Sequence, residues 1–139
     1  MSTMIDVISR LKTRIGVEGP PVTATVEAGH VRRFVEAIGD DNPRWKKEAP
    51  PTFLVALAGA SMHLDDAEDF GKGWLNGGNR FEHFAPVLIG DVLTARGRVA
   101  DVYDKSGSSG DMLFIVFETQ YTNQRGELVA KVRGTVIRR

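Results

Sequence analysis

The 139-residue sequence contains no cysteine, and this absence excludes several kinds of site. A disulfide framework, a thiol nucleophile, a redox dithiol and a zinc site with sulfur ligands all require that residue. Histidine is scarce as well: the chain has three, and they do not have the spacing of metal ligands. We therefore expect no metal ion and no other resident cofactor.

The chain also lacks an excess of charge of either sign. Eighteen basic residues balance eighteen acidic ones, so charge gives no indication of nucleic acid or of an anionic membrane surface as a partner. No segment has the roughly 20 apolar residues of a membrane span, and residues 1–6 have neither the basic flank nor the apolar region of a secretory signal. We expect one domain over residues 1–139, located in the cytoplasm.

The first half of the chain has mainly helical patterns. Apolar residues recur at spacings of three and four in residues 4–15 and 29–38, which predicts two amphipathic helices. Residues 22–26 alternate between apolar and small polar side chains and predict a short strand. Residues 53–63 contain no charge and many small side chains, a composition typical of a helix buried in the middle of a fold.

The second half has β patterns. Residues 64–70 are acidic and residues 71–78 are rich in glycine, so both segments are predicted as loop. Four later segments rich in β-branched and aromatic residues predict antiparallel strands: 80–84, 92–103, 112–122 and 128–138. Connections that contain glycine separate the last three, which predicts that these long strands form a meander. An antiparallel sheet wrapped around the apolar helix is the simplest packing of these elements, which places the chain in the α+β class.

Three segments carry a resemblance to a known family: residues 26–43, 49–53 and 81–91. Together they resemble the MaoC-like hydratases and dehydratases, and more narrowly the N-terminal-half type of fatty-acid-synthase-like dehydratases. The resemblance implies a hot-dog fold, in which a curled antiparallel sheet surrounds one long central helix beginning near Phe53. It also implies pairing with a second such unit, as a homodimer or a heterodimer with another MaoC-like subunit. The implied ligand is an acyl thioester of coenzyme A or acyl carrier protein, and the implied reaction adds water to its double bond or removes it.

The active family motif reads Gly-Asp-x-Asn-Pro-x-His, and this chain departs from it at one decisive position. The corresponding run is Gly39-Asp-Asp-Asn-Pro-Arg-Trp45, so Asp40 matches the catalytic Asp and Asn42 the Asn, but Trp45 stands where the His belongs. An indole N–H donates a hydrogen bond but cannot accept a proton. The resemblance therefore implies a degenerate site that acts with a catalytic partner subunit.

The residues that the resemblance assigns to this site come from three parts of the chain. Asp40 is the candidate catalytic residue. Asn76 stands where relatives frequently have a histidine, and Gly77 follows it. The candidate substrate-binding residues are Asn42, Trp45, Thr52, Phe53, Asn76 and Gly77.

Several alternatives stay open. Asp40 and Asn42 also fit a turn after a helix, and Trp45 also fits a cover over the core. A hot-dog thioesterase would place an acidic residue on or facing the central helix, and residues 53–63 contain none. A non-enzymatic acyl-CoA-binding protein would keep the fold without the chemistry.

The histidines have interpretations of their own. We expect His30 to be exposed and His63 to be structural. His83 replaces the missing motif histidine only if its face of the strand points towards the Asp40 loop.

Overall fold

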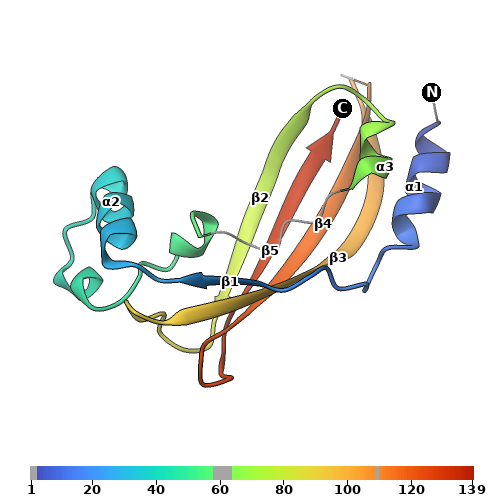
Figure 1. Cartoon of the computed structure of the whole chain (residues 1–139). Helices are drawn as coiled ribbons and strands as arrows, with labels where there is room; N and C mark the ends of the chain where they lie inside the picture. The colour runs from blue at the N-terminus through green and yellow to red at the C-terminus, as the bar shows by residue number, and fades with distance from the viewer. Residues whose placement is uncertain (1–2, 58–63, 109) are drawn as a thin grey trace.

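The molecule is built on one five-stranded antiparallel sheet (Figure 1). The computed structural model describes residues 3–57, 64–108 and 110–139. Across the sheet the strands lie in the order β1-β3-β4-β5-β2. Their bounds are β1 Val22–Thr25, β2 Trp74–His83, β3 Val92–Gly107, β4 Gly110–Thr122 and β5 Leu128–Arg138.

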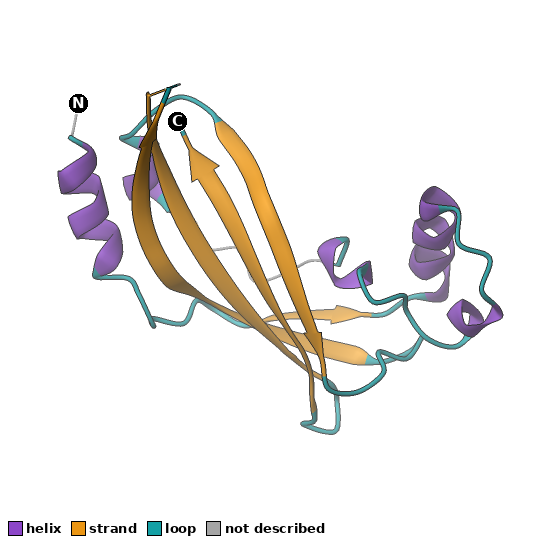
Figure 2. Cartoon of the chain, turned by 180° about the vertical axis from the view of Figure 1, so that it is seen from behind, coloured by secondary structure: helices purple, strands orange, loops and turns teal. Residues whose placement is uncertain are grey.

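The helices lie on one face and at one end of this sheet. They are α1 (Met4–Lys12), α2 (Ala28–Ile38) and α3 (Asp65–Glu68), with two 3₁₀ turns, η1 (Pro43–Lys46) and η2 (Phe53–Val55). α1 and α3 pack on the same sheet face, whereas α2 and η1 project beyond one end of the sheet (Figures 1 and 2). None of the described helices combines the length and the apolar character needed to cross a membrane.

Strand alternation divides the side chains between two faces. On β4, Leu113 and Ile115 are fully buried and pack under α1, while Glu118 faces the opposite side and binds Arg98 at 2.8 Å. A second apolar cluster lies at the α2 end, where Val31 of α2 and Phe53 of η2 are fully buried together. The second cluster therefore anchors α2, the helix that leads to the Asp40 loop.

The pattern of the second half is confirmed, with one extension. β3, β4 and β5 cover the predicted strands, but β2 begins at Trp74, inside the segment predicted as loop. The backbone N–H groups of Lys72 and Gly73 donate to the carbonyl oxygen of Arg139 at 2.7 and 2.9 Å. Residues of low strand propensity become strand here because the open edge of β5 pairs with them, so tertiary context overrides local preference.

The segment 64–70 was also predicted as loop and is partly helical. α3 occupies Asp65–Glu68, and the fully buried Ala67 packs in the cluster under α1. Arg10 of α1 bonds Asp69 at 2.8 Å. Packing against α1 therefore gives this short acidic stretch a turn of helix that its composition does not indicate.

The predicted meander of the last three strands is confirmed, and the earlier strand, β2, lies at the edge of the sheet. β3, β4 and β5 follow one another, but β2 pairs with β5 and not with β3. The connection between β2 and β3 must therefore cross three strand spacings, about 14 Å. Residues 84–91 reach about 26 Å when extended, so they are long enough to make this connection. The backbone N–H of Ala49 donates to the Val87 carbonyl oxygen at 2.8 Å and holds the segment in place.

A long central helix is predicted to begin near Phe53, but the structure has a 3₁₀ turn at this position. Phe53–Val55 form a 3₁₀ turn, with bonds from Val55 N–H to Thr52 O and from Ala56 N–H to Phe53 O. This tighter turn buries Phe53 and Leu54 side by side against α2. The rest of the predicted helix, residues 58–63, lies outside the described residues.

Candidate functional site

The loop that carries Asp40 starts at a left-handed glycine. Gly39 has a φ of 70°, a conformation that residues with a Cβ rarely adopt, and it ends α2 as the predicted C-cap. The next backbone N–H, that of Asp40, donates to the Val35 carbonyl oxygen at 3.2 Å. The backbone of Asp40 is therefore fixed to the last turn of α2.

Two side chains of this loop hold its backbone in place. Asp40 Oδ1 accepts the Asn42 backbone N–H at 3.0 Å, and Asn42 Oδ1 accepts the Arg44 N–H at 3.0 Å. The second bond caps η1, which begins at Pro43. The interpretation of Asp40 and Asn42 as turn residues is thus confirmed, and it is compatible with a binding role for the half-buried Asp40 carboxylate.

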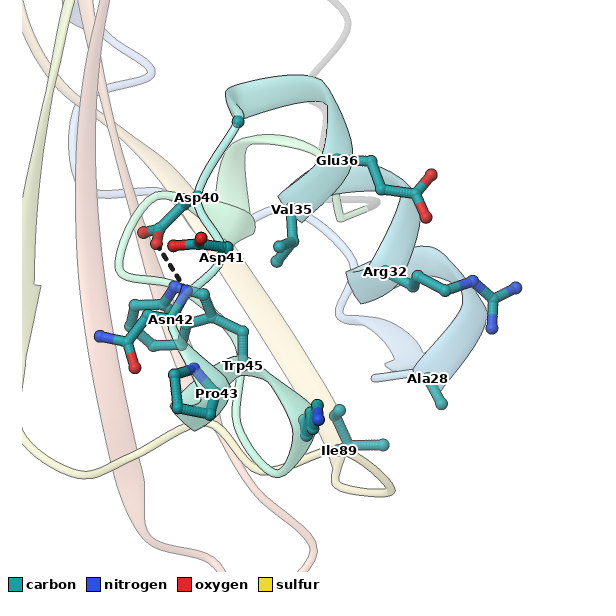
Figure 3. Close-up of a pocket in the computed structure, with 12 residues that line it drawn as sticks. Ala28, Arg32, Val35, Glu36, Asp40, Asp41, Asn42, Pro43, Trp45 and Ile89 are labelled. Carbon is teal, nitrogen blue, oxygen red and sulfur yellow. Dashed lines mark hydrogen bonds between the residues drawn. The ribbon is translucent and has the colours of Figure 1, made fainter.

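Trp45 lies in η1 with its indole ring beside the Asp40 carboxylate (Figure 3). Its Nε1 atom is buried and makes no hydrogen bond within the part of the chain that the structure describes. The indole N–H nevertheless stabilises the charge nearby. The pKa of Asp40 is lowered from its ordinary value, first by the hydrogen bond from Asn42 N–H and second by the Trp45 N–H. Both interactions therefore favour the ionised form of Asp40.

These three residues share a cavity of about 640 Å³. One wall is a face of α2, and the loop after α2 and a residue of the β2–β3 connection form the other (Figure 3). The lining is largely apolar, with charged groups at intervals. It comprises Ala28, Arg32, Val35, Glu36, Gly39, Asp40, Asp41, Asn42, Pro43, Trp45, Lys46 and Ile89.

No described histidine lines this cavity. His30 is half-buried and its ring meets Phe53 edge to face at 4.9 Å, so the expectation that it is exposed is wrong, because the ring packs on the core. His83 Nε2 lies 2.7 Å from the Pro51 carbonyl oxygen. A carbonyl oxygen only accepts, so Nε2 carries the proton and His83 faces the segment before η2 instead of the Asp40 loop. His63 lies outside the described residues.

Thr52 and Phe53 lie away from the cavity that holds Asp40. Phe53 is fully buried and also packs edge to face with Phe34 of α2, at 5.5 Å between ring centroids. Thr52 is exposed and precedes η2. The structure thus gives Phe53 a core position directly beneath α2.

Asn76 and Gly77 lie on β2, in a different part of the molecule. Asn76 lines a second cavity, of about 370 Å³, between β2 and the neighbouring strands. Its Oδ1 accepts the Gly78 N–H at 2.9 Å, where the β2–β5 register shifts. A Cβ on Gly77 would lie 3.1 Å from the Thr135 side chain, so this glycine permits a close approach of β2 to β5. The structure therefore brings together Asp40, Asn42 and Trp45, but not Asn76 or Gly77.

The α2 side of the cavity was not among the predicted site residues. Arg32, Val35 and Glu36 line it together with Ala28, at the spacing of successive helical turns. Because the Asp40 loop follows this helix directly, the same spacing in the sequence indicates which face of the helix lies beside the loop. Ile89 gave no local signal, because its position depends on the bond from its N–H to the Lys47 carbonyl oxygen at 2.9 Å.

The cavity offers binding groups but no complete proton-transfer pair. Asp40 supplies an ionised acceptor, and the indole N–H of Trp45 cannot take a proton. The other charged lining residues are Arg32, Glu36, Asp41 and Lys46. Among the described residues, no group of three or more His, Asp or Glu side chains is arranged to hold a metal ion.

Comparison with known proteins identifies the family. A family model described as "FAS1-like, dehydratase domain region" matches residues 13–132. The chain belongs to this family. Among curated relatives, the UPF0336 protein of Thermobifida fusca is 32% identical over 126 residues, covering 78% of this chain and 80% of that one. A UPF0336 protein of Parafrankia sp. is 30% identical, with coverage of 79% and 81%.

Several solved structures share the fold of this chain. The HadBC complex of Mycobacterium tuberculosis, a 3R-hydroxyacyl-ACP dehydratase, has a chain with a TM-score of 0.70 and 26% identity, covering 89% of this chain and 96% of that one. A chain of the ChsH1-ChsH2 complex from the same organism has a TM-score of 0.77 at 18% identity, with coverage of 96% and 89%. A MaoC-like dehydratase of Rhodospirillum rubrum has a TM-score of 0.63 at 20% identity, with coverage of 90% and 93%. The FAS1-like dehydratase region thus has the hot-dog fold here, as predicted.

Proposed function

We propose that this chain is the acyl-thioester-binding subunit of a hydratase or dehydratase, with a degenerate site of its own and a catalytic partner subunit. One observation carries the proposal: Trp45 occupies the motif position of the histidine, beside an Asp40 that still lines the cavity. The HadBC and ChsH1-ChsH2 structures are complexes of hot-dog subunits, which supports a partner for this chain.

The geometry supports binding over proton transfer. Hydration of an enoyl thioester needs a base to activate water and an acid to protonate carbon, both on the same side of the double bond. Asp40 alone is a poor base, since its pKa is lowered further from neutral by Asn42 and Trp45. The apolar walls from Val35, Trp45 and Ile89 are suited to the hydrocarbon part of the ligand.

The proposed partner pairs with the chain along β2. This strand is ten residues long, lies at the edge of the sheet, and is exposed along its length except at Phe81. The opposite edge, β1, is only four residues long. A long unprotected edge presents backbone hydrogen-bond groups to another strand, so β2 is the edge along which a second hot-dog subunit extends the sheet.

The experiment is an enoyl-CoA hydration assay on three samples: the purified chain, a MaoC-like subunit that retains the motif histidine, and the two together. The proposal predicts background activity for the chain alone and a rate for the mixture above that of the partner. Strong activity of the chain alone that is lost in Asp40→Ala would overturn the degenerate site. A rate for the mixture equal to that of the partner alone would favour a non-enzymatic acyl-CoA-binding protein.

A further inference from the structure

The sheet face opposite α1 carries charged side chains in two adjacent rows, and each row crosses β3, β4, β5 and β2 in turn. We call these eight residues the basic face: Arg98, Glu118, Arg133 and Arg80 in one row, and Arg96, Gln120, Lys131 and Glu82 in the next. Five of them are basic and two are acidic, although the whole chain is neutral. We propose that the basic face binds an acidic helical segment of a further partner protein, with carboxylates held between Arg80 and Arg133.

This surface is separate from the site described above. It shares no residue with the cavity beside α2, so the inference goes beyond the proposed function and does not depend on thioester binding. A subunit that pairs along the edge of β2 extends the sheet in its own plane. The basic face therefore stays accessible in such an assembly.

The basic face is also open to solvent in the single chain. α1 and α3 pack against the other side of the sheet, in the cluster that contains Leu113 and Ile115. The side chains of Arg98, Arg133 and Arg80 are 43%, 49% and 77% exposed. Their guanidinium groups can therefore reach a partner without any rearrangement of the fold.

Arg80 and Arg133 form an unfavourable pair in the chain alone. They lie directly opposite each other on β2 and β5, where like charges destabilise a sheet because the Cβ atoms are only about 5 Å apart. Arg133 lies 3.6 Å from Glu118, whose short contact, at 2.8 Å, is with Arg98. Arg80 lies 3.9 Å from Glu82. Both distances are too long for a hydrogen bond, so the two arginines are only weakly compensated.

A bound anion would relieve this repulsion. A carboxylate between the two guanidinium groups accepts hydrogen bonds from both, and such charge-assisted bonds are among the stronger ones in proteins. Local conflicts of this kind tend to occur where a protein binds something. The opposed arginines therefore indicate a ligand more than a role in holding the sheet together.

The two acidic members of the basic face favour a protein as that ligand. Glu118 and Glu82 repel the phosphates of a nucleic acid or of an anionic membrane, which carry no positive group to place opposite them. A protein segment can present carboxylates to the arginines and a basic or neutral side chain to Glu82. A second copy of the chain, docked through the same face, would bring two surfaces of net positive charge together, so the partner is a different protein.

The dimensions of the basic face fit a short helix. Each row crosses three strand spacings, about 14 Å. This is the length of about nine residues of α-helix, in which side chains four residues apart lie on one face. An acidic helix of this pattern can place successive carboxylates along one row.

The test is a fluorescence anisotropy titration of a labelled peptide with the full chain. The probe is an alanine-based helical peptide of about 16 residues, with glutamate at every fourth position, and the matched probe has glutamine there. We expect saturable binding of the glutamate peptide, weakened when the ionic strength rises from about 50 to about 200 mM, because salt screens exposed charges. Absence of saturable binding, or equal binding of the glutamine peptide, overturns the proposal.

Arg133→Glu is the decisive variant, and Arg33→Glu is its matched control. Both arginines are exposed and both variants have the same net charge, but Arg33 lies on α2, away from the sheet. Reversal of one charge replaces an attraction by a repulsion, so we expect the Kd of the glutamate peptide to rise roughly tenfold in Arg133→Glu and less than about twofold in Arg33→Glu. An equal rise in both variants overturns the proposal, since it would reflect net charge alone.

Arg80→Gln separates binding from structure. It removes one member of the like-charge pair, so we expect the peptide to bind several-fold more weakly while Tm stays the same or rises. A lower Tm with unchanged peptide binding would assign Arg80 a structural role and overturn the proposal.

Parallel titrations distinguish the class of partner. They use a single-stranded DNA oligonucleotide with as many charges as the peptide, and vesicles of phosphatidylglycerol and phosphatidylcholine. We expect both to bind more weakly than the glutamate peptide. Tighter binding of either one that is lost in Arg133→Glu would overturn the assignment of a protein partner.

Discussion

Asp40 and Trp45 act as a pair, because each determines what the other can do. Asp40 is anchored by Val35 and Asn42, and its pKa is lowered first by the Asn42 N–H and second by the buried Trp45 N–H beside it. With imidazole at position 45, the same loop would hold an acceptor and a proton carrier together. Under the proposed function, a single side chain therefore separates a binding loop from a catalytic one.

The substitution Trp45→His tests this view by gain of function. A histidine at the motif position supplies the missing proton-accepting partner of Asp40. Since general acid–base catalysis contributes on the order of 10² or more in rate, we expect enoyl-CoA hydration to rise at least about tenfold over the wild-type chain. The decrease in enoyl absorbance measures it, and the double variant Trp45→His with Asp40→Ala serves as control. No increase in a folded Trp45→His variant would mean that more than this residue is missing.

The lowered pKa of Asp40 also implies that the stability of the folded chain depends on pH. Its pKa is lower in the folded chain than in the unfolded one, so its charge contributes stability above the unfolded value of about 3.9, and this contribution is lost as the pH falls through the folded value. Asp40→Asn should therefore lower Tm near neutral pH and make little difference in strong acid. Melting curves of both proteins across this pH range measure the effect. A Tm difference that does not change with pH would contradict the charge as its cause.

The sequence predicts a site residue well when the residues that hold it in place are close to it along the chain. Asp40, Asn42 and Trp45 were predicted together and lie together, because one short loop with its own hydrogen bonds holds them. Phe53 and Asn76 were grouped with them by resemblance. Their positions depend on how η2 packs on α2 and how β2 pairs with β5, which no local pattern specifies.

At the scale of the elements, α2 determines the geometry of the site through its last residue. Gly39 adopts a left-handed conformation, and a Cβ there would meet no atom within 4 Å. Gly39→Ala should then lower the free energy of unfolding by about 1 kcal/mol through backbone conformation alone. Gly39→Asn should have a smaller effect, since Asn tolerates this region. Urea unfolding measures both.

Gly29 in the first turn of α2 provides a matched control. A Cβ there would lie 3.6 Å from the flexible Arg33 side chain, in ordinary contact. Gly29→Ala should therefore be neutral or stabilising. Equal destabilisation by the two alanine substitutions would contradict the assignment of the Gly39 effect to its φ.

The elements themselves were predictable to different degrees. Helices α1 and α2 and strands β3 to β5 follow from apolar periodicity and β-branched content, because each buries one of its own faces. The first part of β2 did not follow, because glycine-rich residues form a strand only when β5 offers them a partner. The pairing of β2 with β5 was likewise unpredictable, since it depends on the path of residues 84–91 around the end of the sheet.

At the scale of the whole molecule, the two edges of the sheet are unequal. β1 is short, whereas β2 is long and exposed and carries Leu75, which is 42% exposed. If a second subunit pairs along β2, Leu75→Asp introduces charge into that contact. We expect sedimentation velocity to show an assembly for the wild type and a shift towards monomer for the variant. Leu88→Asp is the matched control, because Leu88 is similarly exposed, at 40%, outside β2. A wild-type monomer, or an equal shift in both variants, would contradict pairing along β2.

Under the proposed function, the cavity beside α2 binds an acyl thioester without converting it, and equilibrium dialysis tests both parts at once. The purified chain is incubated with an enoyl-CoA in equilibrium dialysis, and the bound ligand is then recovered and analysed by chromatography. We expect saturable retention of the ligand and recovery of the enoyl thioester unchanged. Recovery of the hydrated product at a rate above that in buffer, or no retention at all, would contradict it.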